Sequence, residues 1–450
     1  MGALALGCVL ANSGTAGAAS PATRATAATL TAAASATAAA PAASRAKAGD
    51  LLDVTLDQLH PTQPAIGFDQ IYYKLGRYTS TKDEANGDLN KRFDDWCETN
   101  GQEKAASVKR GAKLSDASSF TCSVAVGKET AETRAAMKTA VVGPGGVLYL
   151  TDGHHTLTSF LETPDGGPKT RIRLRVVDNL SGLSGAAFWQ TMREKKWVWL
   201  RDENNRPLTT DQLPSHLGLA HFHDDRYRSL VYFTRDIGYQ APSDAAEFLE
   251  FQWGTWLRER VDLGAYDLTT PASYLSAIRT ASETMSATPG DTVVADGRTA
   301  DELGRMKEWN NGKKATGGEF GKLSAPISES KPGKLAYALD FRSHVPAAPA
   351  CTRTVTGTHV GPLVVSSGVT CLNGTKLTGP VVVGAGASLY AKGAEITGPV
   401  QAVGARTVQL CGTSLTGPLS VVGTKERLTL SGPGCTPNTL KGPVQLVGNP

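Results

Sequence analysis

The sequence contains no long run of basic residues, and its formal net charge is only +4. Composition alone therefore gives no electrostatic signature of nucleic-acid binding. Beyond the first few residues, no stretch approaches the roughly 18 consecutive apolar residues of a membrane-spanning helix. Aromatic residues make up only 6% of the chain, but they gather between residues 185 and 260. We expect a conventional hydrophobic core in that region.

Cysteines with the spacing of a zinc site are also absent, because the chain has neither a CxxC pair nor a matching Cys/His pattern. Six cysteines remain once Cys8 is assigned to an N-terminal leader. An even number at short separations indicates an oxidising compartment and three disulfide bonds. Proximity favours the pairs Cys97–Cys122, Cys351–Cys371 and Cys411–Cys435 among about fifteen possible connectivities.

The N-terminal region predicts export. A short apolar segment, Leu4–Leu10, precedes the small residues Ala16–Ala19, which is typical of a secretory signal peptide. We therefore expect a signal peptide over residues 1–18 and a secreted, extracellular protein. Residues 19–49 are rich in Ala, Thr, Ser and Pro and cannot bury enough apolar surface to fold, so they predict a disordered spacer.

A strand–turn–helix pattern near residue 150 is the most informative stretch. The apolar run 147–150 predicts a buried strand, and 156–161 can begin a helix. Gly153 lets the backbone amides of the turn converge, and the start of a helix adds partial positive charge. The pattern therefore predicts a binding site for phosphate or another anion.

Two adjacent histidines lie in this turn. His154 and His155 place proton donors, nucleophiles or metal ligands beside the anion site. In the alternative interpretation, Asp152 caps the helix and the histidines are only polar turn residues. The spacing favours neither interpretation.

The flanking segments predict a mixed α and β domain. We expect a short strand and turn over 51–59, helices over 67–74 and 129–140, and a disulfide-bridged insertion over 79–127. Basic and apolar residues alternate over 171–178, which predicts a half-exposed strand. Its arginines 171, 173 and 175 either protect an edge strand or form an anion-binding face.

Helices are expected over most of 185–260. The sequence around His221, His223, Asp224 and Asp225 has the donor types of a metal site. The aspartates can equally cap the following helix, and we favour that structural interpretation.

The C-terminal part is repetitive. Gly-Pro recurs at residues 361, 379, 398, 417 and 442, each time followed by a short apolar strand. A regular period of short strands and glycine turns predicts a stacked β-solenoid. The two C-terminal cysteine pairs are each about one coil apart, so their disulfides would join neighbouring coils. The sequence does not indicate what the solenoid binds.

Several separated motifs resemble one known family. From about residue 51 to 260, the chain is similar to the ParB-like nuclease family within the ParB/sulfiredoxin superfamily. The matching pieces are Leu59–Gln63, Gly67 followed by Lys74, Asp152–His155, Lys196–Leu200, Asp225–Leu230 and Phe251–Trp253. The resemblance implies an α+β ParB/sulfiredoxin-like domain with a helical extension over 50–345. A right-handed parallel β-helix, the solenoid, is expected over 346–450.

The resemblance also implies roles for individual residues. It places the Gly-His-His turn at a helix N-terminus that binds phosphate, with Gly153, Lys74 and Gln63 among the contacts. Thr156 stands where many relatives have a phosphate-binding arginine, and Lys74 with Arg173 or Arg175 could compensate. His154 occupies the position of the reactive cysteine of sulfiredoxins, so sulfinic-acid repair is not expected.

Two functions remain open from the sequence. The first is a secreted phosphodiesterase or nuclease, in which His154 or His155 acts as general base or metal ligand and Asp152 orients it. Its partner would be nucleic acid or another phosphate-containing ligand, and a divalent metal ion is a candidate cofactor. The second is a non-catalytic anion- or surface-binding module displayed on the solenoid.

Overall fold

The computed structural model describes residues 42–242, 245 and 248–450. The predicted signal peptide and most of the predicted spacer lie outside the described residues. Residues 42–49, which the sequence assigned to the spacer, are structured. They include a 3₁₀ helix, η1 (Ala42–Arg45), and the Gly49 amide donates to the Val176 carbonyl. None of the helices that the structure describes has the length and apolarity needed to cross a bilayer.

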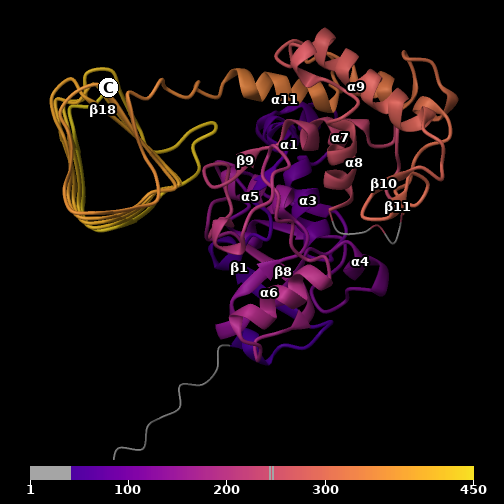
Figure 1. Cartoon of the computed structure of the whole chain (residues 1–450), viewed down its shortest axis with the longest axis horizontal. Helices are drawn as coiled ribbons and strands as arrows, with labels where there is room; N and C mark the ends of the chain where they lie inside the picture. The colour runs from indigo at the N-terminus through magenta and orange to yellow at the C-terminus, as the bar shows by residue number, and fades with distance from the viewer. Residues whose placement is uncertain (1–41, 243–244, 246–247) are drawn as a thin grey trace, which may run out of the picture. The chain divides into compact units, whose positions relative to one another are not determined.

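The N-terminal region contains a mixed five-stranded sheet, and Figure 1 labels two of its strands, β1 and β8, below α3 and α5. The outer pairs comprise one antiparallel pair, β1 with β8, and one parallel pair, β2 with β7. The central strand β6 is parallel to β8 and antiparallel to β7. In spatial order the strands are β1 (Leu51–Thr55), β8 (Arg171–Asn179), β6 (Thr139–Val142), β7 (Leu148–Leu150) and β2 (Leu59–His60).

Helices cover both faces of this sheet. Ala140 and Val142 of β6 belong to the main core, whereas Val141 packs on the opposite face with Phe188 and Met192. On the main-core side, α1 packs against α5, α7 and α11 (Figure 1). The helices are α1 (Phe68–Thr79), α2 (Lys82–Ala85), α3 (Lys91–Thr99), α4 (Ala131–Ala135), α5 (His154–Glu162), α6 (Gly185–Glu194), α7 (Arg226–Thr234), α8 (Leu249–Leu257), α9 (Pro271–Ala287), α10 (Gly318–Leu323) and α11 (Lys334–Ser343).

Short paired strands and 3₁₀ turns complete this region. The paired strands are β3 (Ala65–Ile66) with β9 (His223–Asp224), β4 (Ala105–Val108) with β5 (Phe120–Cys122), and β10 (Val293–Ala295) with β11 (Arg298–Thr299). The 3₁₀ turns are η2 (Leu56–Gln58), η3 (Ala117–Ser119), η4 (Pro144–Gly146), η5 (Thr210–Gln212), η6 (Leu263–Ala265) and η7 (Trp309–Gly312).

Two of the predicted elements have different bounds. The helix predicted over 129–140 is only the short α4, and Thr139 begins the strand β6. All four residues of β6 are buried, so packing on both faces of the sheet outweighs the helical pattern of the sequence. The helix after the Gly-His-His turn begins at His154 rather than at Thr156. The aromatic residues between 185 and 260 do form core, and Phe188, Phe233 and Trp253 are among the largest buried side chains.

All three predicted disulfides are confirmed. Cys97–Cys122 joins α3 to β5 beside the main core, while Cys351–Cys371 and Cys411–Cys435 lie in the solenoid. Each closes a loop of 20 to 25 residues. Closing a loop of this length restricts the unfolded chain and typically stabilises the fold by about 3 kcal/mol.

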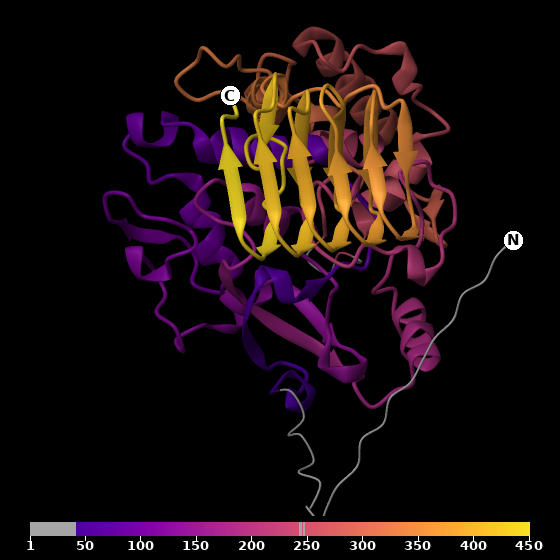
Figure 2. The ribbon, with the colours of Figure 1, turned by 90° about the vertical axis from the view of Figure 1, so that its left-hand side faces the viewer.

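The C-terminal region is a parallel β-solenoid, as predicted. Three five-stranded parallel sheets run along it, and Figure 2 shows neighbouring strands as arrows lying side by side. The first sheet contains β12 (Arg353–Val355), β15 (Val369–Asn373), β18 (Ser388–Lys392), β21 (Thr407–Cys411) and β24 (Arg427–Thr429). The second contains β13 (Thr358–Val360), β16 (Lys376–Thr378), β19 (Glu395–Thr397), β22 (Ser414–Thr416) and β25 (Thr439–Lys441). The third contains β14 (Leu363–Val365), β17 (Val381–Val383), β20 (Val400–Val403), β23 (Leu419–Val422) and β26 (Val444–Val447).

The repeated Gly-Pro step forms one corner of each coil. Gly379, Gly398 and Gly417 all have left-handed backbone angles, with φ near +140°. A Cβ atom at Gly398 would lie 2.4 Å from the carbonyl oxygen of Gly379 on the neighbouring coil. Glycine is therefore required here both by the backbone conformation and by the close stacking of coils.

The stacking requirement predicts different effects for two glycine substitutions. Gly386 also has a positive φ, but a Cβ atom there would meet open space. We expect Gly386→Ala to lose about 1–2 kcal/mol of stability from the backbone alone. Gly398→Ala should lose clearly more, because its methyl group also collides with the Gly379 carbonyl. Urea denaturation of the full-length variants, followed by circular dichroism, compares the two losses, and equal losses would refute the stacking explanation.

Candidate functional site

A cavity of about 270 Å³ lies where α1, α5, α7 and α8 meet. Its wall includes the Gly-His-His turn and polar side chains from each of these helices. Four residues that the sequence placed at the anion site line it: Gln63, Lys74, Gly153 and Thr156. Further lining residues are Gln70, Glu98, Lys138, Thr151, Asp152, His154, His155, Arg228, Tyr232, Arg235, Phe248, Glu250 and Phe251.

The turn before α5 presents free backbone donors to this cavity. Gly153 is the N-cap, with φ of +104° and no side-chain cap. The first hydrogen bond of the helix runs from the Leu157 amide to the Gly153 carbonyl. The amides of His154, His155 and Thr156 precede that bond, so they require partners outside the helix. Together with the helix dipole they favour a negatively charged ligand.

Both histidines accept hydrogen bonds from the backbone. His154 Nε2 accepts from the Thr62 amide at 3.1 Å, and His155 Nε2 accepts from the Gly67 amide at 3.0 Å. A ring nitrogen that accepts carries no proton, so each neutral ring holds its proton on Nδ1. The two side chains therefore fix the segment before α1 against the start of α5. Their remaining N–H groups are donors rather than bases.

Burial keeps these rings uncharged. His154 is 3% exposed, and this desolvation lowers its pKa to about 4. The pKa of His155 is also well below its ordinary value, first because of burial and then because of the nearby charge of Arg228. Neither histidine carries a positive charge at neutral pH, so positive charge in the cavity comes from other residues.

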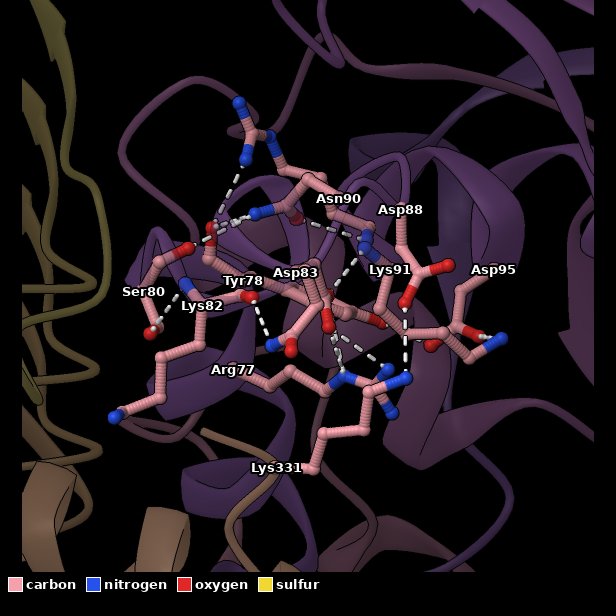
Figure 3. A network of polar contacts seen from close by, with 12 residues as sticks. Arg77, Tyr78, Ser80, Lys82, Asp83, Asp88, Asn90, Lys91, Asp95 and Lys331 are labelled. Atoms are coloured by element: carbon pink, nitrogen blue, oxygen red, sulfur yellow. Dashed lines mark hydrogen bonds and ion pairs between the residues drawn. The ribbon is translucent and has the colours of Figure 1, made fainter. Parts of the chain in front are cut away.

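Lys74 is held in place by a buried carboxylate. Its Nζ lies 2.7 Å from Asp95 Oδ2, and Lys91 pairs with the other oxygen of Asp95 at 2.7 Å. Tyr78 donates to Asp95 as well, at 2.5 Å, and Figure 3 shows Asp95, Lys91 and Tyr78 within one polar network. Burial alone would raise the pKa of Asp95, but the two lysines lower it below its ordinary range. The carboxylate thus remains ionised and orients Lys74 beside the cavity.

Helix α7 supplies two arginines to the cavity wall. Arg228 and Arg235 both face Glu250 at the start of α8, but only Arg235 forms a short ion pair with it. Arg228 Nη2 lies 3.6 Å from Glu250 Oε2, and its Nε and Nη1 have no hydrogen-bond partner among the described residues. The arginine side chain is only 5% exposed. A buried cation with unpaired donors is costly unless an anion completes the site.

Two acidic residues near the turn differ in their surroundings. Asp152 Oδ2 pairs with Lys138 Nζ at 3.2 Å. Within the described residues, Asp152 does not cap α5 and forms no hydrogen bond with a histidine. These contacts give no support to an orienting role of Asp152 toward His154 or His155, and that role stays a prediction. Glu98, at the end of α3, lines the cavity, and within the described residues its carboxylate forms no ion pair.

Other predicted ligands lie elsewhere. Arg173 pairs with Glu129 at 2.7 Å and with Asp53 at 3.3 Å, and it does not line the cavity. Asp225 caps α7 by accepting from the Tyr227 and Arg228 amides, in agreement with the structural interpretation of that segment. In the part of the chain that the structure describes, no three His, Cys, Asp or Glu side chains are placed to hold a metal ion.

Helical spacing could have identified some of the cavity residues that the sequence analysis did not name. Arg228, Tyr232 and Arg235 are spaced by four and three positions, which places them on one face of α7. That spacing could have grouped them before the structure was known. Gln70 lies four positions before Lys74 on α1, so the same spacing could have placed it beside that predicted residue. Glu98 and Lys138 carry no such signal, because their position at the cavity depends on how α3 and β6 meet α5.

Comparison with known proteins gives a family match for the region that contains this cavity. Residues 52–259 match the family described as "Putative ParB-like nuclease". This part of the chain belongs to the ParB-like nuclease family, as the sequence motifs predicted. A solved structure that matches is protein Atu1540 from Agrobacterium tumefaciens, at 18% identity and a TM-score of 0.34, over 53% of this chain and 93% of that chain. The comparison with curated proteins found no match.

The uncharged state of His154 predicts a pH dependence of stability. Its folded pKa lies below its ordinary value of 6.5, so unfolding takes up a proton at acid pH. The contribution of His154 is therefore complete above pH 6.5 and is lost as the pH falls toward 4, by an amount on the order of 3 kcal/mol. Urea unfolding of His154→Gln between pH 7.5 and 4 should show a shallower decline than that of the wild type.

A matched control isolates this effect. His344 is an exposed histidine at the end of α11, and His344→Gln should retain the pH dependence of the wild-type protein. If His154→Gln and wild type decline in parallel, His154 is not held uncharged in the folded protein.

Proposed function

We propose that the cavity binds a phosphodiester and that the domain hydrolyses it, with nucleic acid as the substrate. The observation that supports this proposal is Arg228, a buried arginine with two unpaired guanidinium nitrogens, which lines the same cavity as the first residues of α5. A phosphate group offers several strong acceptors and negative charge, and arginine pairs with it in a planar, bidentate geometry. Arg228 thus takes the part that the sequence assigned to Arg173.

Glu98 is the base that this proposal requires. Both histidines use their Nε2 lone pairs on backbone amides, and Glu250 is engaged by arginines. Glu98 would accept a proton from water while the water oxygen bonds to phosphorus. The bond from phosphorus to the leaving sugar oxygen then breaks, and that oxygen takes a proton from solvent. The amides of α5 and Arg228 would stabilise the charge that develops on the phosphate.

A second candidate is a non-catalytic phosphate-binding module. It is favoured by the engagement of both histidine lone pairs, because neither Nε2 is then free to accept a proton from water. The three disulfides support an extracellular location for either function, because such bonds persist in oxidising compartments.

Removal of Arg228 should weaken phosphate binding. We expect Arg228→Met to lower the affinity for a fluorescently labelled single-stranded oligonucleotide by about 10- to 100-fold, since charge-assisted hydrogen bonds are lost. Fluorescence anisotropy titrations measure the affinity, and circular dichroism reports whether the variant folds. Arg226 lies on the same helix but is exposed and outside the cavity, so Arg226→Met should bind like the wild type. Equal losses in both variants would contradict an anion site at Arg228.

Removal of the Glu98 carboxylate should separate binding from cleavage. We expect Glu98→Gln to bind the oligonucleotide but to cleave it about 10²- to 10⁴-fold more slowly. Cleavage would be followed on gels with Mg²⁺, Mn²⁺, Zn²⁺ or EDTA present. The exposed Glu103 lies outside the cavity, so Glu103→Gln is the matched control. Wild type that binds without cleaving would support the binding module, and cleavage at an unchanged rate by Glu98→Gln would exclude Glu98 as the base.

A further inference from the structure

A second buried polar group in the cavity lacks a partner. Gln70 lies in the first turn of α1, one helical turn before Lys74, and both residues line the cavity. Gln70 is only 8% exposed. Its Oε1 is shielded from solvent and has no hydrogen-bond partner among the described residues. Buried amide oxygens in folded proteins are nearly always hydrogen-bonded, so this atom requires an explanation.

None of the described residues that line the cavity donates a hydrogen bond to Gln70 Oε1. The Lys74 ammonium donates to Asp95, and the Gln63 side-chain amide donates to the Ala65 carbonyl at 2.9 Å. A phosphate group cannot satisfy Gln70 either, because Oε1 is an acceptor and an ionised phosphodiester has no proton to donate. The missing partner is therefore a donor on another part of the ligand.

The size of the cavity limits where that donor can be. At about 270 Å³, the cavity is slightly smaller than the 300–1,000 Å³ typical of pockets that enclose a whole small molecule. It encloses the phosphate and the groups directly attached to it rather than a long stretch of ligand. The donor thus belongs to the same nucleotide as the phosphate, as a sugar hydroxyl or a base amino group.

We propose that Gln70 is a specificity-determining residue that accepts a hydrogen bond from a hydroxyl or amino group of the nucleotide whose phosphate is bound at α5. This inference rests on the proposed function, because it assumes that the cavity binds a phosphate. A ligand without the donor leaves Oε1 buried and unpaired, whereas a ligand with the donor satisfies it. The site therefore discriminates between the two, by about 10- to 100-fold in affinity.

Four labelled homopolymers distinguish the two kinds of donor. Oligouridylate against oligodeoxyuridylate isolates the 2′-hydroxyl, and oligodeoxyadenylate against oligo-2′-deoxynebularine, whose purine base lacks the 6-amino group, isolates the base amino group. The full-length wild type would be titrated with each by fluorescence anisotropy. We expect it to bind the donor-bearing member of one pair about 10- to 100-fold more tightly. Gln70→Met, which has a similar shape but no acceptor, should bind that member as weakly as the donor-lacking one.

A conservative variant tests whether the acceptor itself matters. Gln70→Glu keeps an acceptor oxygen but adds negative charge, so it should weaken binding of all four homopolymers while keeping the discrimination. Equal wild-type affinity within both pairs would overturn the role of Gln70, as would full discrimination by Gln70→Met. In either case, a lower oligonucleotide affinity of Arg228→Met would still support the phosphate site at α5. Failure of the wild type to bind any homopolymer would overturn both proposals.

Discussion

The two hydrogen bonds that His154 and His155 accept from backbone amides determine the geometry of the cavity. They join the first turn of α5 to Thr62 and Gly67, which precede α1. The orientation of α1, and with it the position of Lys74, therefore depends on two imidazole rings. Because both rings are buried and uncharged, they can act as acceptors without placing an unpaired charge in the core. The two rings thereby hold the turn in place.

Of the four positively charged side chains around the cavity, three are paired with a carboxylate at short distance and one, Arg228, is only partly paired. Asp95 holds Lys74, Asp152 holds Lys138, and Glu250 holds Arg235. Arg228 shares Glu250 at a longer distance and keeps two unpaired nitrogens. Pairing fixes the orientation of the first three side chains, whereas the partly unpaired arginine leaves positive charge beside the cavity, which is the basis of the proposed anion site.

The solenoid is held together by a different kind of contact. Each coil buries its apolar residues against those of its neighbours, so the interior is a continuous row of Val, Leu, Ile and Ala side chains. Parallel pairing of successive strands satisfies the backbone along each sheet, and glycine at the corners allows the coils to approach closely. Such a structure depends on nearest neighbours along the chain, which is why a short repeating pattern was enough to predict it.

Local chemistry accounts for what the sequence by itself determined. The repeat period, the proximity of the cysteines and the strand–glycine–helix pattern predicted the solenoid, the three disulfides and the turn at Gly153, because each depends on residues close in the chain. Distant contacts decided the rest. Burial on both faces of the sheet made residues 139–142 a strand, and the backbone amides of Thr62 and Gly67 occupied the lone pairs of the histidines. Only the packing of α1, α3 and α7 around α5 brought Gln70, Glu98 and Arg228 to one cavity, because no local pattern encodes which helix faces meet.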